Sequence, residues 1–135
     1  MEKNKQVVIA GSAKMQSAVE TWKTYWEEKE GHVVSNFPKP IPRETFLSEY
    51  PQVHEDFFKD IEQADVLFIA NEDKNETEGY IGAETFAEIV FGIAQNLLHE
   101  KQIDIILAKM PSKAVQSHEE ITLWITLGWL RVLEK

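Results

Sequence analysis

The sequence predicts an α/β fold, a doubly wound sandwich with a mainly parallel sheet of four to five strands. Short runs rich in β-branched residues alternate with longer segments of helical apolar spacing. The run over residues 65–70 is apolar after its first residue, which is typical of a central parallel strand covered on both faces. The 135 residues contain no internal repeat and no low-complexity linker, so we expect a single domain over residues 1–135.

The first half of the chain contains two predicted strands and two predicted helices. We expect a strand over 7–10 that meets a loop at Gly11, a helix over 13–29 closed by Gly31, a strand over 32–37, and a helix over 51–64. Proline favours the first turn of a helix, so Pro51 is predicted to open the last of these after a stiff proline-rich loop.

The second half continues the alternation. We expect a strand over 65–70, a polar loop over 71–78, a helix from about 82 to 98, a strand over 103–108, a short helix that starts at Ser117, and an edge strand over 129–133. Ser117 and Glu120 have the spacing of a capping box, and Gly128 stands where the short helix would stop. A single helix over 119–133 is the alternative for the end of the chain.

Strands that alternate with helices imply right-handed βαβ units, as in Rossmann- or flavodoxin-like folds. Ligands of such sheets bind beyond the carboxyl ends of the strands, near the point where the strand order reverses. This rule places three loops at the site, over residues 11–14, 36–43 and 71–82.

Composition and charge narrow the classes of function. The chain has no cysteine, which excludes a disulfide framework, a thiolate zinc site and a cysteine nucleophile. A net charge of −9 without a basic stripe argues against binding to long nucleic acid. No apolar stretch is long enough for a signal peptide or a membrane span, so we expect a cytoplasmic protein that does not bind membranes.

Metals, cofactors and assembly follow from the remaining residues. Four histidines (His32, His54, His99 and His118) are scattered without ligand spacing, so we expect neither a metal site nor a cofactor. Aromatic residues are enriched at interfaces, and Trp124 and Trp129 are therefore predicted to pack a homodimer or a higher homo-oligomer.

Two acids on one predicted helix are the candidate catalytic residues. Glu84 and Glu88 are four residues apart over 82–98 and therefore lie on one side of that helix. Glu88 is flanked by apolar residues, so it either points into a cleft or is a solvated surface residue. Gly79 and Gly82 precede the helix, and a glycine-rich approach lets the backbone pass close to a ligand.

These segments resemble the nucleoside 2-deoxyribosyltransferase superfamily. The likeness rests on residues 65–70 (DVLFIA), a polar loop and residues 82–92 (GAETFAEIVFG), together with the start VVIAGS over 7–12. The specific motif is a threonine three residues before a glutamate and a glycine four residues after it. The resemblance implies that Glu88 is the nucleophile at the anomeric carbon of a nucleoside, a reaction that suits a carboxylate because the sugar develops oxocarbenium character.

The first loop resembles one branch of that superfamily, the 2′-deoxynucleoside 5′-monophosphate N-glycosidases. The resemblance implies that Gly11, Ser12 and Lys14 hold a 5′-phosphate; the alternative is that Ser12 is an ordinary helix cap and Lys14 a solvated lysine. In the third loop we expect Asn71, Tyr80 and Gly82 to contact the same small-molecule nucleoside or nucleotide.

The chain also departs from the family pattern. Gly82 stands where the transferases place an aspartate, and Val8 or Ile9 stands where they place a tyrosine. The acid that protonates the departing base must then be another residue, and Glu84, Asp73 and Glu72 are candidates. The alternatives are a lonely-guy-type phosphoribohydrolase, whose expected arginine is absent, and a non-catalytic nucleotide-binding or signalling module of the same fold.

Overall fold

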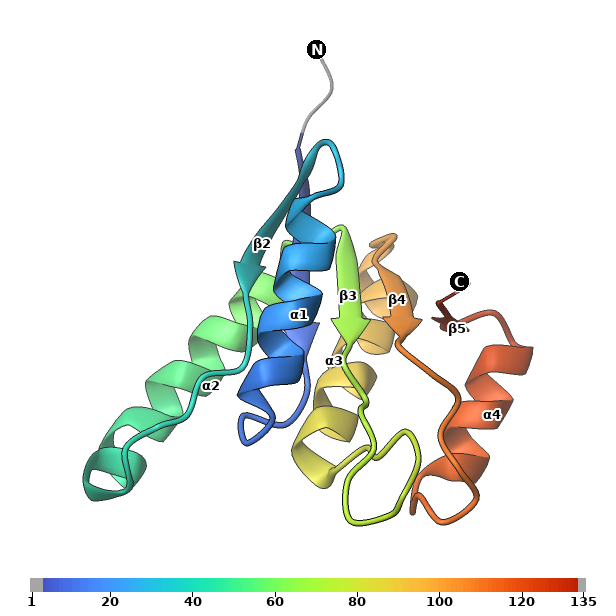
Figure 1. Ribbon diagram of the computed structural model, residues 1–135. Helices are drawn as coiled ribbons and strands as arrows, with labels where there is room; N and C mark the ends of the chain where they lie inside the picture. The colour runs from blue at the N-terminus through green and yellow to red at the C-terminus, as the bar shows by residue number, and fades with distance from the viewer. Residues whose placement is uncertain (1–3, 134–135) are drawn as a thin grey trace.

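The computed structural model describes residues 4–133, which form the α/β fold that the sequence predicts. Figure 1 shows the elements in chain order: β1 (Lys5–Ala10), α1 (Gln16–Glu27), β2 (His32–Asn36), η1 (Arg43–Thr45), α2 (Phe46–Glu62), β3 (Val66–Ile69), α3 (Ala83–His99), β4 (Asp104–Leu107), α4 (His118–Thr126) and β5 (Arg131–Val132). No helix in this part of the chain is both long and apolar enough to cross a membrane.

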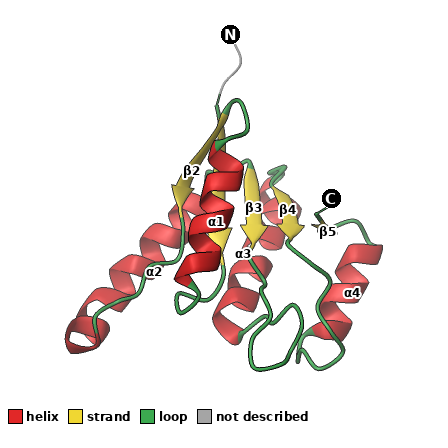
Figure 2. Cartoon of the chain, in the orientation of Figure 1, coloured by secondary structure: helices red, strands yellow, loops and turns green. Residues whose placement is uncertain are grey.

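The strands form one parallel sheet in the order β2-β1-β3-β4-β5. The order reverses between β1 and β3, as in flavodoxin-like folds. The connection after β1 leads to β2 on one side of this point, and the connection after β3 leads to β4 on the other side. Figure 2 shows that the loops after β1, β2, β3 and β4 gather at one edge of the sheet. The topology therefore places a ligand site beyond the ends of β1 and β3.

Helices cover both faces of the sheet, which explains why the central strands are apolar throughout. Val7 and Ile9 of β1 face the α1 side and cluster with Trp26, whereas Val8 faces α2 and α3 and clusters with Ile61. In Figure 1, α1 lies in front of the sheet and α2 and α3 lie behind it. All of these side chains except Trp26 are fully buried, and Trp26 is 4% exposed.

Two helices begin at residues that the sequence did not predict. Helix α1 begins at Gln16 instead of residue 13, because residues 13–14 form a turn closed by a hydrogen bond from Met15 N to Ser12 O. Helix α2 begins at Phe46, and Pro51 lies inside it instead of opening it. A proline inside a helix leaves the carbonyl four residues earlier without a donor, here that of Leu47. Leu47 is 86% exposed, so water can hydrate its carbonyl and the helix tolerates the proline.

The buried face of α3 is rotated from the one that the apolar spacing predicts. The apolar spacing of residues 82–98 predicts Val90 and Leu97 on the core face, but they are 40% and 54% exposed. Glu88 and Gly92 instead share the buried face with Ile89. A Cβ on Gly92 would lie 2.8 Å from Leu67 Cδ2, so the missing side chain lets α3 approach β3 closely. This close approach holds the buried face of α3, and Glu88 with it, against the sheet.

The end of the chain forms a short helix and an edge strand, and the single-helix alternative is wrong. Helix α4 stops at Thr126, Gly128 adopts φ +77°, and β5 then pairs in parallel with β4. Ser117 precedes α4 as predicted, but no capping box forms: its hydroxyl is buried and makes no hydrogen bond within residues 4–133. Trp124 stacks on Phe86 within the same chain, with 5.4 Å between the ring centroids.

Candidate functional site

A cleft of about 580 Å³ opens at the carboxyl edge of the sheet, between α2 and α3. The three loops that the sequence placed at the site all line it, with Gly11–Met15 after β1, Asn36–Ile41 after β2, and Ala70, Asn71 and Tyr80 after β3. Helix α2 contributes a further wall that the sequence did not predict. The cleft is therefore bounded by the carboxyl ends of β1 and β3, where the strand order reverses, and by the helices α2 and α3.

Glu88 lies at the inner end of this cleft, in the second turn of α3, and is 5% exposed. Among the described residues no group donates a hydrogen bond to its carboxyl group. Burial raises the pKa of Glu88 from its ordinary 4.5 to about 8, and the nearby negative charge of Glu84 adds to the effect. Glu88 is thus a buried, unpartnered acid that opens onto a ligand-sized space.

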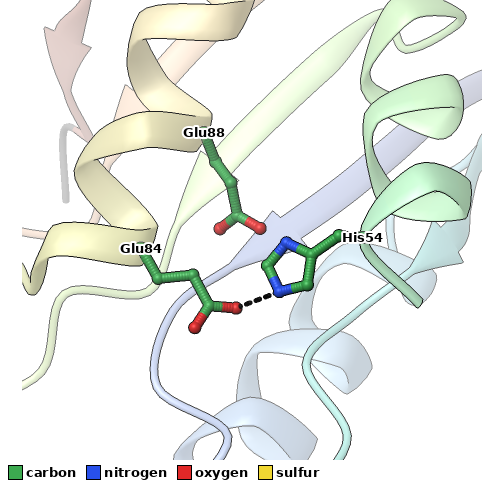
Figure 3. Close-up of side chains that lie close together, drawn as sticks. All are labelled: His54, Glu84 and Glu88. Atoms are coloured by element: carbon green, nitrogen blue, oxygen red, sulfur yellow. Dashed lines mark ion pairs between the residues drawn. The ribbon is translucent and has the colours of Figure 1, made fainter. Parts of the chain in front are cut away.

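His54 is the residue of this site that sequence reasoning missed. It projects from α2 toward α3, and its Nε2 lies 2.9 Å from Glu84 Oε1. Figure 3 shows His54, Glu84 and Glu88 converging on the same space, and one ligand atom of each lies within 4.8 Å of the other two. The signal in the sequence was weak, because the contact depends on the packing of α2 against α3, which apolar spacing does not specify.

A ladder of rings along α2 holds the imidazole of His54. Phe46, Tyr50, His54 and Phe58 follow one another at four-residue steps, and Phe58 in turn contacts Phe91 of α3. The closest of these contacts is between Tyr50 and His54, with 4.0 Å between ring centroids. Rings at this spacing lie above one another on a helix face, so His54 is packed along one side and reaches the cleft with its nitrogens.

The same three side chains have the composition of a cation site. One imidazole nitrogen and two carboxylates this close together offer three ligand atoms to a divalent ion. Two of the three groups, however, already satisfy each other through the contact between His54 and Glu84. In the structure the three groups form an imidazole–carboxylate pair beside a buried acid.

The loop after β1 lines the cleft with Gly11–Met15. The Ser12 hydroxyl accepts a hydrogen bond from Lys14 N at 3.3 Å, so it fixes the turn and does not cap α1. Within residues 4–133, the backbone N–H groups of Ser12 and Ala13 have no acceptor. A Cβ on Gly11 would lie 3.1 Å from Ala70 O, which explains why glycine stands where this loop passes the end of β3. Free N–H groups beside Lys14 suit an anion.

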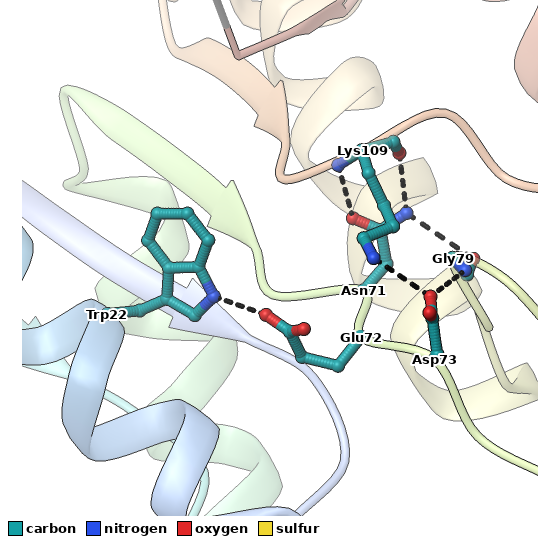
Figure 4. A network of polar contacts seen from close by, with 6 residues as sticks. All are labelled: Trp22, Asn71, Glu72, Asp73, Gly79 and Lys109. Carbon is teal, nitrogen blue, oxygen red and sulfur yellow. Dashed lines mark hydrogen bonds and ion pairs between the residues drawn. The ribbon is translucent and has the colours of Figure 1, made fainter. Parts of the chain in front are cut away.

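Asn71 follows β3 and is 1% exposed. Its Nδ2 donates to Lys109 O at 2.7 Å and to Gly79 O at 3.3 Å, and its Oδ1 accepts from Lys109 N at 3.2 Å (Figure 4). These bonds leave the amide engaged with the protein itself. The structure therefore places Asn71 at the cleft as a residue that fastens two loops together.

Two acids of this loop, Glu72 and Asp73, are also paired. Asp73 accepts hydrogen bonds from Lys109 Nζ at 2.9 Å and from Gly79 N at 3.0 Å, and these bonds hold its pKa below the ordinary value of 3.8. Glu72 accepts from Trp22 Nε1 at 2.6 Å. A general acid needs a raised pKa. Asp73 is therefore excluded from that role.

Tyr80 and Gly82 form the mouth of the cleft beside α3. Tyr80 is 36% exposed, and its hydroxyl would lie 3.3 Å from a Cβ on Gly82. The ammonium group of Lys74 lies 5.0 Å from the centre of the Tyr80 ring. Gly82 itself is the residue before the first turn of α3 and has ordinary extended backbone angles. A side chain at residue 82 would press on the Tyr80 hydroxyl.

Comparison of the chain with protein-family models, with curated proteins and with solved structures gives no significant match.

Proposed function

We propose that this protein cleaves the N-glycosidic bond of a nucleoside or a nucleoside monophosphate, as a hydrolase or a transferase, with Glu88 acting at the anomeric carbon. The observation that carries the proposal is the position of Glu88, an unpartnered acid that is 5% exposed and faces a cleft at the switch point of the sheet. An acid kept from water in this way is unfavourable for stability, and such groups cluster at functional sites.

The chemistry of the bond fits this placement. Breaking it gives the sugar oxocarbenium character, and a carboxylate at short range either stabilises that charge or forms a bond to the anomeric carbon. A buried carboxylate does so with little competing solvation, so its charge acts at full strength on the sugar.

The rest of the cleft suits the other parts of a nucleotide. The exposed rings of Phe46 and Tyr50 line the α2 wall, where they offer apolar surfaces to a nucleobase. Ser12, Ala13 and Lys14 also line the cleft, and their N–H groups and ammonium group suit a 5′-phosphate. The three parts of the ligand would then meet at Glu88.

The test is to incubate the protein with deoxynucleosides, ribonucleosides and their 5′-monophosphates and to measure the free base. We expect turnover of at least one of these classes and a loss of about a thousandfold or more in Glu88→Gln. Glu49→Gln is the matched control, since Glu49 lines the same cleft on α2. Turnover that survives in Glu88→Gln would contradict the proposal.

A second candidate function is binding without catalysis. It is favoured by Gly82, which stands where the resemblance implies an aspartate. In that case no free base appears, but a nucleotide still raises the melting temperature, and it does so equally in Glu88→Gln.

We also propose that the chain assembles as a homo-oligomer through the outer surface of α3 and α4. Apolar side chains are exposed there to an unusual degree: Leu97, Leu98, Leu123 and Leu127 are each more than half exposed, and Trp129 is 36% exposed. Sedimentation analysis of the wild type against Leu123→Glu tests this, because a charge in the interface should yield monomers. A monomeric wild type would contradict it.

A further inference from the structure

We propose that His54 is the proton carrier of this site and Glu84 the residue that positions it: His54 takes the proton of the Glu88 carboxyl group and delivers it to the departing nucleobase. The inference rests on the proposed N-glycoside cleavage and assigns the group that protonates the leaving base.

The two nitrogens of His54 have different surroundings. Nε2 faces Glu84 Oε1 at 2.9 Å, and a neutral imidazole satisfies that carboxylate by carrying its hydrogen on Nε2. Nδ1 is then a lone-pair acceptor, and within the described chain it has no hydrogen-bond partner. Figure 3 shows the imidazole beside both carboxyl groups. The geometry thus sets an acceptor next to an acid that has no other partner.

Glu84 positions His54. Its carboxylate oxygen lies 2.9 Å from Nε2 and so fixes which nitrogen carries the first hydrogen. The side chain of Glu84 is 62% exposed and that of His54 is 16% exposed, so the pair lies between solvent and the buried Glu88. Stacking against Tyr50 limits how far the imidazole can turn away.

The proton and electron pairs balance over a complete cycle. The O–H bond of Glu88 breaks, and its proton forms an N–H bond on His54 Nδ1. The bond between the anomeric carbon and the base then breaks, its electron pair stays on the base nitrogen, and the Glu88 carboxylate bonds to or stabilises the anomeric carbon. His54 passes its proton to the base nitrogen, so the base leaves neutral.

Water completes the hydrolysis. Its oxygen bonds to the anomeric carbon, one of its protons moves to His54, and the electron pair of any sugar–Glu88 bond returns to the carboxylate. His54 then returns the proton to Glu88. The net change is nucleoside plus water to free base plus sugar, with each residue restored.

The test separates protonation of the leaving group from attack on the sugar. The base of a nucleoside must be protonated as it leaves. When the same sugar is linked to 4-nitrophenol, the leaving group is the stable 4-nitrophenolate anion, which needs no proton. Both substrates are assayed at pH 7, one unit below the Glu88 pKa of about 8, where most molecules still hold the proton that His54 delivers and about a tenth already have an ionised Glu88. His54→Asn should lower kcat/KM for the nucleoside by about 10²–10⁴-fold and change that of the nitrophenyl glycoside less than about tenfold.

Three further variants serve as controls for this test. Glu88→Gln should lose turnover of both substrates. Glu84→Gln keeps the imidazole but loses its positioning carboxylate, so nucleoside turnover should fall less than in His54→Asn. His118→Ala is the matched control, because His118 lies on α4 and contacts Pro111 O outside the cleft. If His54→Asn does not fold, His54→Ala supplemented with imidazole replaces it, and imidazole should restore nucleoside turnover.

Distinct outcomes contradict the two proposals. Equal losses on both substrates in His54→Asn would overturn the proton carrier while leaving Glu88 in its role. Loss of turnover in a chelator, restored by a divalent cation, would also overturn it, because the three side chains would then act as a cation site. A wild type that turns over neither substrate would overturn the proposed function itself.

Discussion

The side-chain amide of Asn71 is hydrogen-bonded to both backbone groups of Lys109, accepting from its N–H at 3.2 Å and donating to its carbonyl at 2.7 Å. The pairing joins the segment after β3 to the segment after β4, and a third bond adds Gly79. Neither loop has a regular element of its own at this point. The amide therefore takes the place of a backbone ladder and shapes one wall of the cleft.

Asn71→Ala should lower the free energy of unfolding by about 2–4 kcal/mol, because it leaves buried donors and acceptors of Lys109 and Gly79 unpaired. It should also lower turnover, since the loop that leads to α3 loses its anchor. Urea denaturation and kinetics measure the two effects.

Asn96→Ala is the control for that prediction. Asn96 makes the same double pairing with Ile103, at 2.8 Å and 3.0 Å, but at the amino end of β4, away from the cleft. We expect this variant to lose stability and keep kcat/KM. An equal loss of activity in both variants would show that stability alone governs turnover.

Gly79→Ala should be more harmful than Gly31→Ala, although both glycines have positive φ, +64° and +79°. The left-handed backbone conformation lowers the free energy of unfolding of each alanine variant by about 1–2 kcal/mol. Only at Gly79 does the new Cβ meet backbone, 2.8 Å from both Met110 O and Pro111 Cα, whereas at Gly31 nothing lies within 4 Å. Thermal denaturation of the two variants tests the difference, and equal shifts would contradict the packing at Gly79.

Stability should fall as the pH rises from about 4.5 to about 8. The pKa of Glu88 is raised on folding, so in this range the folded state holds one more proton than the unfolded state. The contribution of Glu88 to stability is fully present below pH 4.5 and is lost as the pH passes 8, at about 1.4 kcal/mol per pH unit and on the order of 4–5 kcal/mol in all.

Glu88→Gln isolates that effect, because the amide does not titrate. Urea denaturation at several pH values should give a flatter curve for the variant than for the wild type over this range. Parallel curves would contradict a buried, protonated Glu88.

Lys14→Ala should raise KM for a nucleoside 5′-monophosphate by about tenfold or more and leave the unphosphorylated nucleoside unchanged. The reason is that an ammonium–phosphate hydrogen bond contributes about 1.5–3 kcal/mol. Lys101→Ala serves as the control, because Lys101 follows the end of α3 and does not line the cleft. Equal effects of Lys14→Ala on both substrates would place the phosphate elsewhere.

The sheet and the position of the cleft were predictable from local patterns. Runs such as Val7–Ala10 are β-branched and apolar on both faces, and the alternation with helices then fixes which loops meet at the carboxyl edge. The convergence of Gly11, Tyr80 and Glu88 on one cleft follows from that topology without any knowledge of side-chain packing.

Other features depend on tertiary packing, which local patterns do not encode. His54 reaches Glu84 only because α2 lies against α3. The start of α2 was misplaced because Pro51 usually marks a first turn, yet the exposed Leu47 carbonyl lets the helix extend past it. The amide of Asn71 looked like a ligand contact because the sequence does not reveal that Lys109 takes both of its polar atoms.

The contact of α3 with β3 at Gly92 links core packing to the position of Glu88. Gly92 and Glu88 are one helical turn apart on the same buried face, so a larger residue at 92 would lever the helix outward and carry the carboxyl group with it. Substitutions deep in the apolar layer beneath α3 would then appear as losses of activity in proteins that still fold. Selection for turnover would thus constrain Leu67, a residue that never meets the substrate.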